Sequence, residues 1–484
     1  MDAEHGAAAG GATQSHDPDY PERFLEFMRS GWTDSVLPVA PVPQAPNHAA
    51  RRAALSAAFA GQTLVIPTGG ERVRANDTHF PFRPGTDFVH LTGEHDPDSV
   101  LVLDPAGAAT LYVRPRSPRD TDEFFRDRAY GELWIGRRHT LAEKAAELGI
   151  ATAHRDDLAA VLDGCAPGRT RVLRGLNREV DAAVRPAGDG GADCELAEFL
   201  SELRLVKDPW EVAQLQDAID ATVRGFEDVA RVLPADRPVS ERLLDGVFGL
   251  RARHDGNGVG YSAIVGAGTH ATILHWVRNT GATAPGALLL MDMGVENHAL
   301  YTADVTRTVP VSGRFSPAQR RIYDLVYASQ QAGIDALKPG VRFEDIHLTC
   351  MRVLAAGLSD LGLLPVSVDE AMDPASVLYR RWTLHGFGHM LGLDVHDCAQ
   401  ARRERYRDGV LEEGYVLTVE PGLYFQPEDE RVPAELRGIG VRIEDDVLVT
   451  AAGPRVLSDG LPRTADEVES WLAVQRAAGP RLPG

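Results

Sequence analysis

HGFGHMLGLDVHD, residues 385–397, places three histidines and two aspartates within thirteen positions. His385 and His389 have the i, i+4 spacing of the H-E-x-x-H zinc motif, but Gly386 stands where that motif has its general-base glutamate. Glycines at 386, 388 and 392 also disfavour a helix, because each costs about 1 kcal/mol relative to alanine. The stretch therefore predicts a metal site of another kind, with further ligands elsewhere in the chain.

Acidic residues border several apolar runs that predict buried strands. The four that matter are Asp292, Asp304, Glu420 and Glu444. Arg442 lies two residues before Glu444 and so on the same face of the predicted strand. Buried carboxylates need partners or metal. Four carboxylates and one histidine form an oxygen-rich set that suits Mn²⁺, Co²⁺ or Fe²⁺, and four carboxylates are enough to hold two ions.

Size and composition exclude several classes of protein. The chain has 484 residues, of which 44% are hydrophobic and 25% charged, as in soluble globular proteins of two or three domains. A net charge of −20 argues against nucleic acid or an anionic membrane as partner. The four cysteines lack CxxC spacing, and we see neither a signal peptide nor a membrane-length apolar run. We therefore expect a soluble cytoplasmic protein.

Turn-rich segments divide the chain. We predict a disordered tail at 1–19, an N-terminal α/β domain at 20–190 with strands at 62–66 and 99–103, and a linker at 186–194. A catalytic α/β or α+β domain at 191–465 and a C-terminal tail at 466–484 follow.

The predicted catalytic domain contains two helices and five strands. The helices begin after Asp208 and Ser316, each followed by a first-turn proline. The strands are 261–265, 288–291, 305–311, 415–419 and 440–449. A G-x-G-x-x-A sequence at 266–271 mimics a dinucleotide fingerprint, but we expect the next residues, 271–277, to form a strand, so no helix would follow to bind a pyrophosphate. The Arg-rich run 401–409 is typical of a solvated surface loop.

Five ordered blocks resemble the Xaa-Pro aminopeptidases (aminopeptidase P) of the pita-bread metallopeptidases. They are YSAIVGAG…ILHW (261–276), MDMG…TADVTRT (291–308), HGFGHMLGLDVHD (385–397), LTVEPGLY (417–424) and GVRIEDD (440–446). FRPGTDFVHLTGEHDPDSVLVL, residues 82–103, resembles the creatinase-type N-terminal domain of the same enzymes. The resemblance covers roughly residues 20–465. It implies a pita-bread domain with internal pseudo-symmetry and a dinuclear Mn²⁺ centre.

The resemblance also implies a role for each site residue. Asp292 would ligate the first metal, Asp304 and Glu444 would bridge both, and His389 and Glu420 would complete the second. His385, His396, His275 and Arg442 would line the substrate site, and Tyr261 would form a proline pocket. Asp292 and Asp304 are separated by one residue more than in many relatives, and we place that residue in the hairpin 295–301.

The implied reaction removes the N-terminal residue from peptides with proline in second position, through attack by a hydroxide that bridges two metals. Glu420 would accept the proton of the water, and His396 with His275 would donate to the oxyanion. A homodimer or homotetramer is implied, in which residues near Phe88 would close a neighbour's pocket.

Four alternatives remain. Prolidase would cleave only Xaa-Pro dipeptides with the same metals. Methionine aminopeptidase normally lacks a large N-terminal domain, and creatinase has the architecture without the metal. A pita-bread binding module without catalysis is the non-enzymatic alternative, although such modules have usually lost ligands that this sequence retains.

Overall fold

The computed structural model describes residues 19–166, 168–186 and 188–483. The predicted tail at 1–19 lies, apart from Asp19, outside the described residues. The chain divides into two compact units between Leu196 and Ala197, within helix α9 (Gly191–Leu203), which begins inside the predicted linker. None of the described helices is both long and apolar enough to span a membrane.

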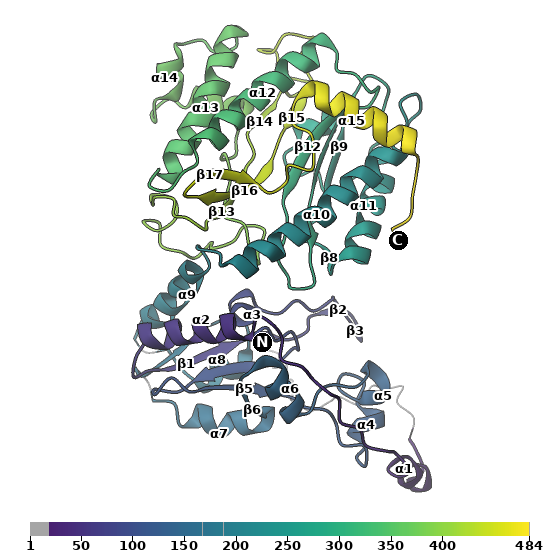
Figure 1. Cartoon of the computed structure of the whole chain (residues 1–484), viewed down its shortest axis with the longest axis vertical. Helices are drawn as coiled ribbons and strands as arrows, with labels where there is room; N and C mark the ends of the chain where they lie inside the picture. The colour runs from purple at the N-terminus through teal and green to yellow at the C-terminus, as the bar shows by residue number, and fades with distance from the viewer. Residues whose placement is uncertain (1–18, 167, 187, 484) are drawn as a thin grey trace, which may run out of the picture. The chain divides into compact units, whose positions relative to one another are not determined.

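The first unit contains a five-stranded mixed sheet in the order β6-β5-β4-β1-β7. The predicted strands at 62–66 and 99–103 are confirmed as β1 (Thr63–Pro67) and β4 (Val100–Leu103), which pair antiparallel. The other strands are β5 (Ala109–Val113), β6 (Ala151–His154) and β7 (Thr170–Val172), with a separate hairpin of β2 (Val73–Ala75) and β3 (Thr78–His79). Helices α2 and α7 run along opposite sides of the sheet (Figure 1).

Helices of the first unit are short apart from α2. They are α1 (Glu22–Met28), α2 (Ala45–Ala58), α3 (Thr86–Thr92), α4 (Glu123–Arg126), α5 (Glu132–Ile135), α6 (Leu141–Leu148), α7 (Leu158–Asp163) and α8 (Arg178–Ala183), with a 3₁₀ turn η1 (Arg155–Asp157). Phe88 lies in α3 and is fully buried. The expectation that residues near Phe88 close a neighbour's pocket stays a prediction, in which Phe88 itself would act through its packing because its ring is buried.

The second unit is built from two halves that repeat one pattern, a helix pair followed by a three-stranded antiparallel sheet. The first half consists of α10 (Pro209–Val232), α11 (Glu241–Asp255), β9 (Ile264–Ala267), β10 (Leu288–Met293) and β12 (Val305–Pro310). The second consists of α12 (Pro317–Ala336), α13 (Phe343–Asp360), β13 (Val416–Val419), β16 (Asp445–Thr450) and β17 (Gly453–Val456). Each helix pair packs together. This repetition is the pseudo-symmetry that the resemblance implies.

Both predicted helix starts are confirmed. Asp208 and Ser316 accept hydrogen bonds from the backbone of the third helical residue, Glu211 and Gln319, and the side chains of these residues bond back to the cap. Such capping boxes satisfy two otherwise unpaired N–H groups. The apolar face of α10 packs into the core through Phe226, Val229 and Ala230.

Smaller elements complete the second unit. They are β8 (Gly258–Val259), β11 (Val295–Glu296), β14 (Gly422–Tyr424), β15 (Gly440–Arg442), α14 (Val368–Met372), α15 (Ala465–Ala478), η2 (Gly268–Thr272) and η3 (Leu378–Trp382). The prediction of a C-terminal tail at 466–484 is wrong for the residues in α15, which packs against α10 and buries Val468 and Leu472. Its N-cap Thr464 forms a capping box with Glu467, a signal that the sequence carries.

Two strand predictions need correction. The strand predicted at 261–265 begins only at Ile264, and Tyr261, which precedes it, contacts Asp292 through its hydroxyl. The strand predicted at 440–449 is broken at Ile443 and Glu444. Before the break the chain pairs with β14, and after it with β13, so this segment joins two sheets and places Glu444 at the joint.

Candidate metal centre and active site

Two strands of the first half position the aspartates. Asp292 is on β10 opposite Thr306 of β12, and Asp304 immediately precedes β12. The hairpin at 295–301, in which we place the extra residue between the aspartates, is closed by a hydrogen bond from the Asn297 N–H to the Tyr301 carbonyl (2.9 Å). The two carboxylates are brought together: the Tyr261 hydroxyl is 2.6 Å from Asp292 Oδ1 and 2.6 Å from Asp304 Oδ1.

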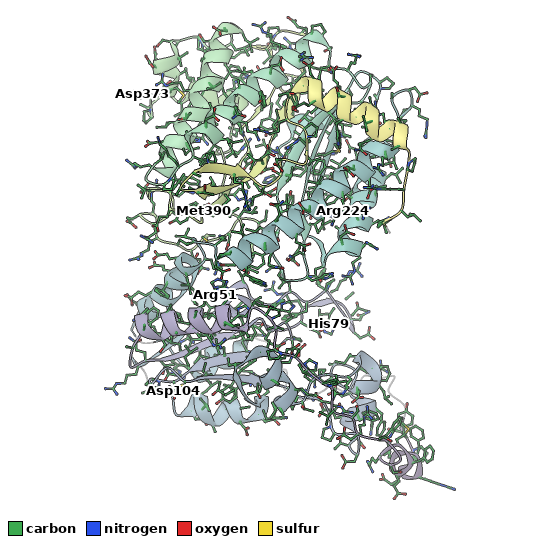
Figure 2. The ribbon with its side chains drawn as sticks, in the orientation of Figure 1. Arg51, His79, Asp104, Arg224, Asp373 and Met390 are labelled. Atoms are coloured by element: carbon green, nitrogen blue, oxygen red, sulfur yellow. The ribbon has the colours of Figure 1, made fainter. Side chains whose placement is uncertain are left out.

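The opening stretch lies beside β13. The backbone of His389 forms two hydrogen bonds with Thr418. Its N–H donates to Thr418 Oγ1 (3.1 Å), and its carbonyl accepts from the Thr418 N–H (2.9 Å). Met390, labelled in Figure 2, is bridged to Leu417. The Glu420 N–H donates to the Phe387 carbonyl at 2.7 Å. These bonds fix a histidine and a glutamate that are far apart in sequence on one side of the strand.

The five predicted ligands converge. Candidate ligand atoms of Asp304, His389 and Glu444 all lie within 4.8 Å of one another. His389 Nε2 is 3.3 Å from Asp304 Oδ2 and 3.7 Å from Glu420 Oε1. The Tyr261 contacts connect Asp292 to the same group.

The electrostatics of the cluster favour bound cations. Burial raises the pKa of Asp292 and Glu444, and it raises the pKa of Glu420 to about 7. Burial lowers the pKa of His389, but the hydrogen bond to Asp304 and the charges of Asp304 and Glu420 outweigh it, so that the pKa is about 9. Arg442 bonds Asp292 Oδ2 and offsets part of the negative charge. Carboxylates held together in this way are stabilised by a divalent ion between them, so the residues fit a hard-metal site.

The remaining predicted residues surround this cluster. His385 Nδ1 is 3.5 Å from Glu420 Oε2, and the His396 ring stands perpendicular to the His389 ring with centroids 4.3 Å apart. Burial lowers the pKa of His385 to about 3 and also lowers that of His396, so both rings are neutral at pH 7. His275 is exposed, yet it lies near enough to contribute to both shifts.

The positions of two tyrosines differ from what the sequence predicted. The Tyr261 hydroxyl contacts the carboxylates of Asp292 and Asp304, two of the candidate ligands, whereas we expected it in a proline pocket. Tyr424 received no role, but its hydroxyl is 2.8 Å from His385 Nε2 and accepts from Arg442 Nη1 at 2.9 Å. The sequence signal for Tyr424 was its position four residues after Glu420 in LTVEPGLY.

A pocket of about 510 Å³ opens onto the cluster. Its lining includes His389, His396, Glu420, Arg403, Tyr406 and Arg407. The prediction that 401–409 is only a solvated loop is therefore wrong in part. Tyr406 is buried and accepts a hydrogen bond from the Met390 N–H at 2.7 Å, because the loop folds back onto the histidine segment.

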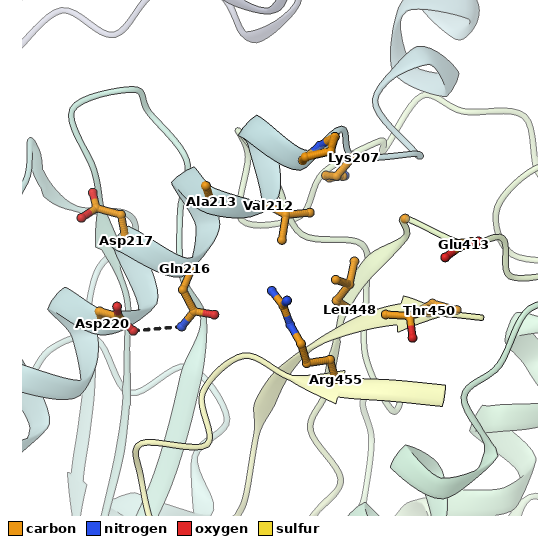
Figure 3. A pocket seen from close by; sticks show the side chains of 13 residues that line it. Lys207, Val212, Ala213, Gln216, Asp217, Asp220, Glu413, Leu448, Thr450 and Arg455 are labelled. Atoms are coloured by element: carbon orange, nitrogen blue, oxygen red, sulfur yellow. Dashed lines mark hydrogen bonds between the residues drawn. The ribbon is translucent and has the colours of Figure 1, made fainter. Parts of the chain in front are cut away.

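A second pocket, of about 640 Å³, lies between α10, β16 and β17 (Figure 3). Val212 and Leu448 contribute apolar surface, and the Gln216 amide donates to Asp220 at 2.9 Å. None of the predicted site residues lines it. Its size alone does not make it the reaction site, because the candidate ligands His389 and Glu420 line the other pocket.

Comparison with known proteins agrees with this geometry. The family model for the aminopeptidase P N-terminal domain matches residues 48–173, and that for metallopeptidase family M24 matches residues 213–451. Xaa-Pro aminopeptidase 1 of Streptomyces coelicolor is 53% identical over 460 residues, which cover 94% of this chain and 93% of that protein. The chain belongs to the aminopeptidase P branch of family M24.

Solved structures of this branch have the same fold. The Pseudomonas aeruginosa aminopeptidase PepP matches with a TM-score of 0.80 and 32% identity, over 91% of this chain and 100% of that one. Aminopeptidase P from Escherichia coli with the inhibitor Pro-Leu matches with a TM-score of 0.79 and 29% identity, over 90% and 100%. The predicted N-terminal domain type, pita-bread fold and family are thus confirmed, and as an M24 metallopeptidase the chain is a divalent-metal enzyme.

A glycine in the opening stretch offers a test of the ligand placement. A Cβ at Gly388 would overlap the Thr418 carbonyl oxygen, whereas a Cβ at Gly386 would have no neighbour closer than 3.9 Å. We expect Gly388→Ala to lower divalent-metal affinity by about 10- to 100-fold, the usual effect of disturbing a ligand's support. Metal titration by calorimetry measures this, with Gly386→Ala as the matched control. Equal affinities for the two variants would contradict the placement of His389 by β13.

Proposed function

We propose that the chain hydrolyses the bond between the first residue of a peptide and a proline in second position. The observation that carries this is the convergence of Asp292, Asp304, His389, Glu420 and Glu444 from separate strands into one buried cluster. Its 53% identity to a Xaa-Pro aminopeptidase over nearly the whole chain supports the substrate class. The retained ligands and this identity also disfavour the non-catalytic binding module.

We infer that these five residues bind two divalent ions. Asp304 and Glu444 lie at the centre of the cluster and would bridge both ions, with Asp292 on one side and His389 and Glu420 on the other. The Thr306 hydroxyl donates to Glu444 Oε2 at 2.6 Å and would leave the other oxygen free for metal. The oxygen-rich donor set supports Mn²⁺. Divalent ions held by these residues would supply an activated water at neutral pH, since metal binding lowers the pKa of water to about 7 in favourable zinc sites.

The acid–base work falls to Glu420. Its carboxylate is 18% exposed, toward the pocket, and lies between His385 and His389. It would take a proton from the attacking water and deliver it to the proline nitrogen as the C–N bond breaks. His396 lines the pocket and, as a neutral imidazole, has one N–H that can donate to a substrate oxygen, while His385 would line the substrate site beside Glu420 and Tyr424. With His275 on the exposed side, His396 would stabilise the oxyanion of the tetrahedral intermediate.

The substrate class also has a physical basis. Proline has no N–H and a fixed φ, so proteases that bind the backbone through this N–H handle Xaa-Pro bonds poorly. The free amine of the substrate would dock near Asp292, which limits cleavage to the first residue. Arg442 donates to Asp292 and to Tyr424, and so would hold this end of the site in place.

The test is a panel of peptides assayed with Mn²⁺. We expect cleavage of tripeptides and longer peptides of the form Xaa-Pro-Yaa, release of the first residue only, and no cleavage when alanine replaces the proline. Mass spectrometry of the products measures this. Cleavage confined to Xaa-Pro dipeptides would favour prolidase, and an inactive, metal-loaded chain would contradict the proposal.

Three finer points belong to the proposal. We propose Mn²⁺ as the native metal, the cytoplasm as the location, and a homodimer or homotetramer as the assembly. The absence of CxxC pairs supports a reducing compartment, and the net charge of −20 disfavours nucleic acid as a partner. Light scattering of the purified protein would give the assembly state.

A further inference from the structure

A buried glutamate outside the metal cluster organises the segment that carries His275. Glu241 is the first residue of α11 and its side chain is 0% exposed. Each of its carboxylate oxygens has two partners. Oε1 accepts from the Ala267 N–H (2.9 Å) and lies 2.8 Å from His270 Nδ1, whereas Oε2 accepts from Trp276 Nε1 (2.8 Å) and from the Gly281 N–H (2.6 Å).

These four partners enclose one stretch of chain. Ala267 is the last residue of β9 and Gly281 is the point at which the chain returns, so residues 268–280 form a loop whose two ends meet at one carboxylate. His270 and Trp276 come from within the loop and stack on each other, with ring centroids 3.9 Å apart and an interplanar angle of 26°. His275 directly precedes the tryptophan that is bonded to Glu241.

The surroundings show that the arrangement is closely fitted. A Cβ at Gly281 would come within 2.6 Å of the His270 ring and 2.8 Å of Glu241 Oε1, so only glycine leaves room there. Asn279 is buried and has a φ of +50°. Its side chain accepts a hydrogen bond from the Val265 N–H in β9 and donates one to the carbonyl of Ala263, which precedes β9. Burial would raise the pKa of Glu241, but the hydrogen bonds from Trp276, Ala267, His270 and Gly281 lower it, so it is ionised at neutral pH.

We propose that Glu241 is a positioning residue that holds the 268–280 loop so that His275 faces the reaction site. This rests on the proposed function, because His275 acts there on the substrate. A buried carboxylate with four partners is suited to this task, since an amide in its place would turn an NH₂ group toward two of the same donors. The chemistry of Glu241 itself is not used in the reaction.

The loop geometry is tested without substrate. In Glu241→Gln, we expect faster amide hydrogen exchange at Ala267, at Gly281 and through residues 268–280, and unchanged exchange in β13. Asp228→Asn is the matched control: it also removes a buried charge from the same unit, where Asp228 pairs with Arg251 at 2.8 Å. Exchange in 268–280 that stays at the wild-type rate in Glu241→Gln would overturn the proposal.

The link to His275 is tested by a double-mutant cycle on a Xaa-Pro tripeptide. We expect Glu241→Gln to lower kcat by about 10- to 100-fold with a small change in KM, because a misplaced catalytic group costs rate more than binding. In a His275→Ala background the same substitution should have little further effect. Equal losses in both backgrounds would show a merely structural role and overturn the proposal. A wild-type chain that leaves Xaa-Pro peptides intact would instead refute the proposed function, while the exchange result would still decide the loop geometry.

Discussion

Glu420→Ala will lower kcat on a Xaa-Pro tripeptide by about 10³-fold or more, since general acid–base groups contribute about 10²–10⁴ and this residue is also placed as a ligand. Its carboxylate lies 3.7 Å from His389 Nε2 and 3.5 Å from His385 Nδ1, between the cluster and the pocket. Among the described residues, the only carboxylates that line the pocket are Glu420 and Asp397, and Asp397 is bonded to Arg204 and Lys207.

Steady-state kinetics at saturating Mn²⁺ will measure the loss. Glu413→Ala is the matched control, because Glu413 is an exposed glutamate of the same unit and should be replaceable without effect. If Glu420→Ala kept more than a tenth of the wild-type kcat, the assignment of the proton transfer to this residue would be wrong.

Asp397→Ala will lower the free energy of unfolding by about 3–5 kcal/mol, the usual result of removing one partner from a buried ion pair. Asp397 Oδ1 accepts from Arg204 Nε at 2.9 Å and Oδ2 lies 3.3 Å from Lys207 Nζ, and all three side chains are at most 6% exposed. Without the carboxylate, two buried cations face each other. A Cβ at Gly392 would overlap the Asp397 carboxylate, so this carboxylate packs closely against the backbone of the histidine segment.

Chemical denaturation will measure this loss. Asp369→Ala is the control, because Asp369 is 86% exposed and pairs with Arg352 at the surface, where a bridge contributes about 0–1 kcal/mol. Burial would raise the pKa of Asp397, but Arg204 and Lys207 lower it, so its contribution is present above the unfolded pKa of about 4 and is lost as the pH falls below that value. A loss under about 1 kcal/mol at pH 7 would contradict the account of this network.

Three of the five candidate metal ligands could be predicted because they lie at or next to the ends of apolar strands that the sequence makes visible. Asp292 and Asp304 border β10 and β12, and Glu420 follows β13. Their support could not be predicted, since it comes from distant residues: Arg307 donates to the Glu444 carbonyl at 2.6 Å and to Asp445 at 2.7 Å, across more than a hundred positions.

The loop at 268–280 shows that a local sequence pattern can mispredict secondary structure. Its β-branched residues predict a strand at 271–277, but the structure has a 3₁₀ turn at Gly268–Thr272 and no strand after it in these described residues. Four hydrogen bonds to Glu241, a residue of a preceding helix, outweigh the local preference. Local propensity is likewise overridden at Ile443 and Glu444, where one segment changes sheets.

Elemental analysis of the purified protein, after Mn²⁺ reconstitution and removal of unbound metal, tests the central claim most directly. A cluster of two aspartates, two glutamates and one histidine should retain about two ions per chain, and Asp304→Ala should lose both because it would bridge them. Fewer than about 0.2 ions per wild-type chain would contradict a metal centre at these five residues.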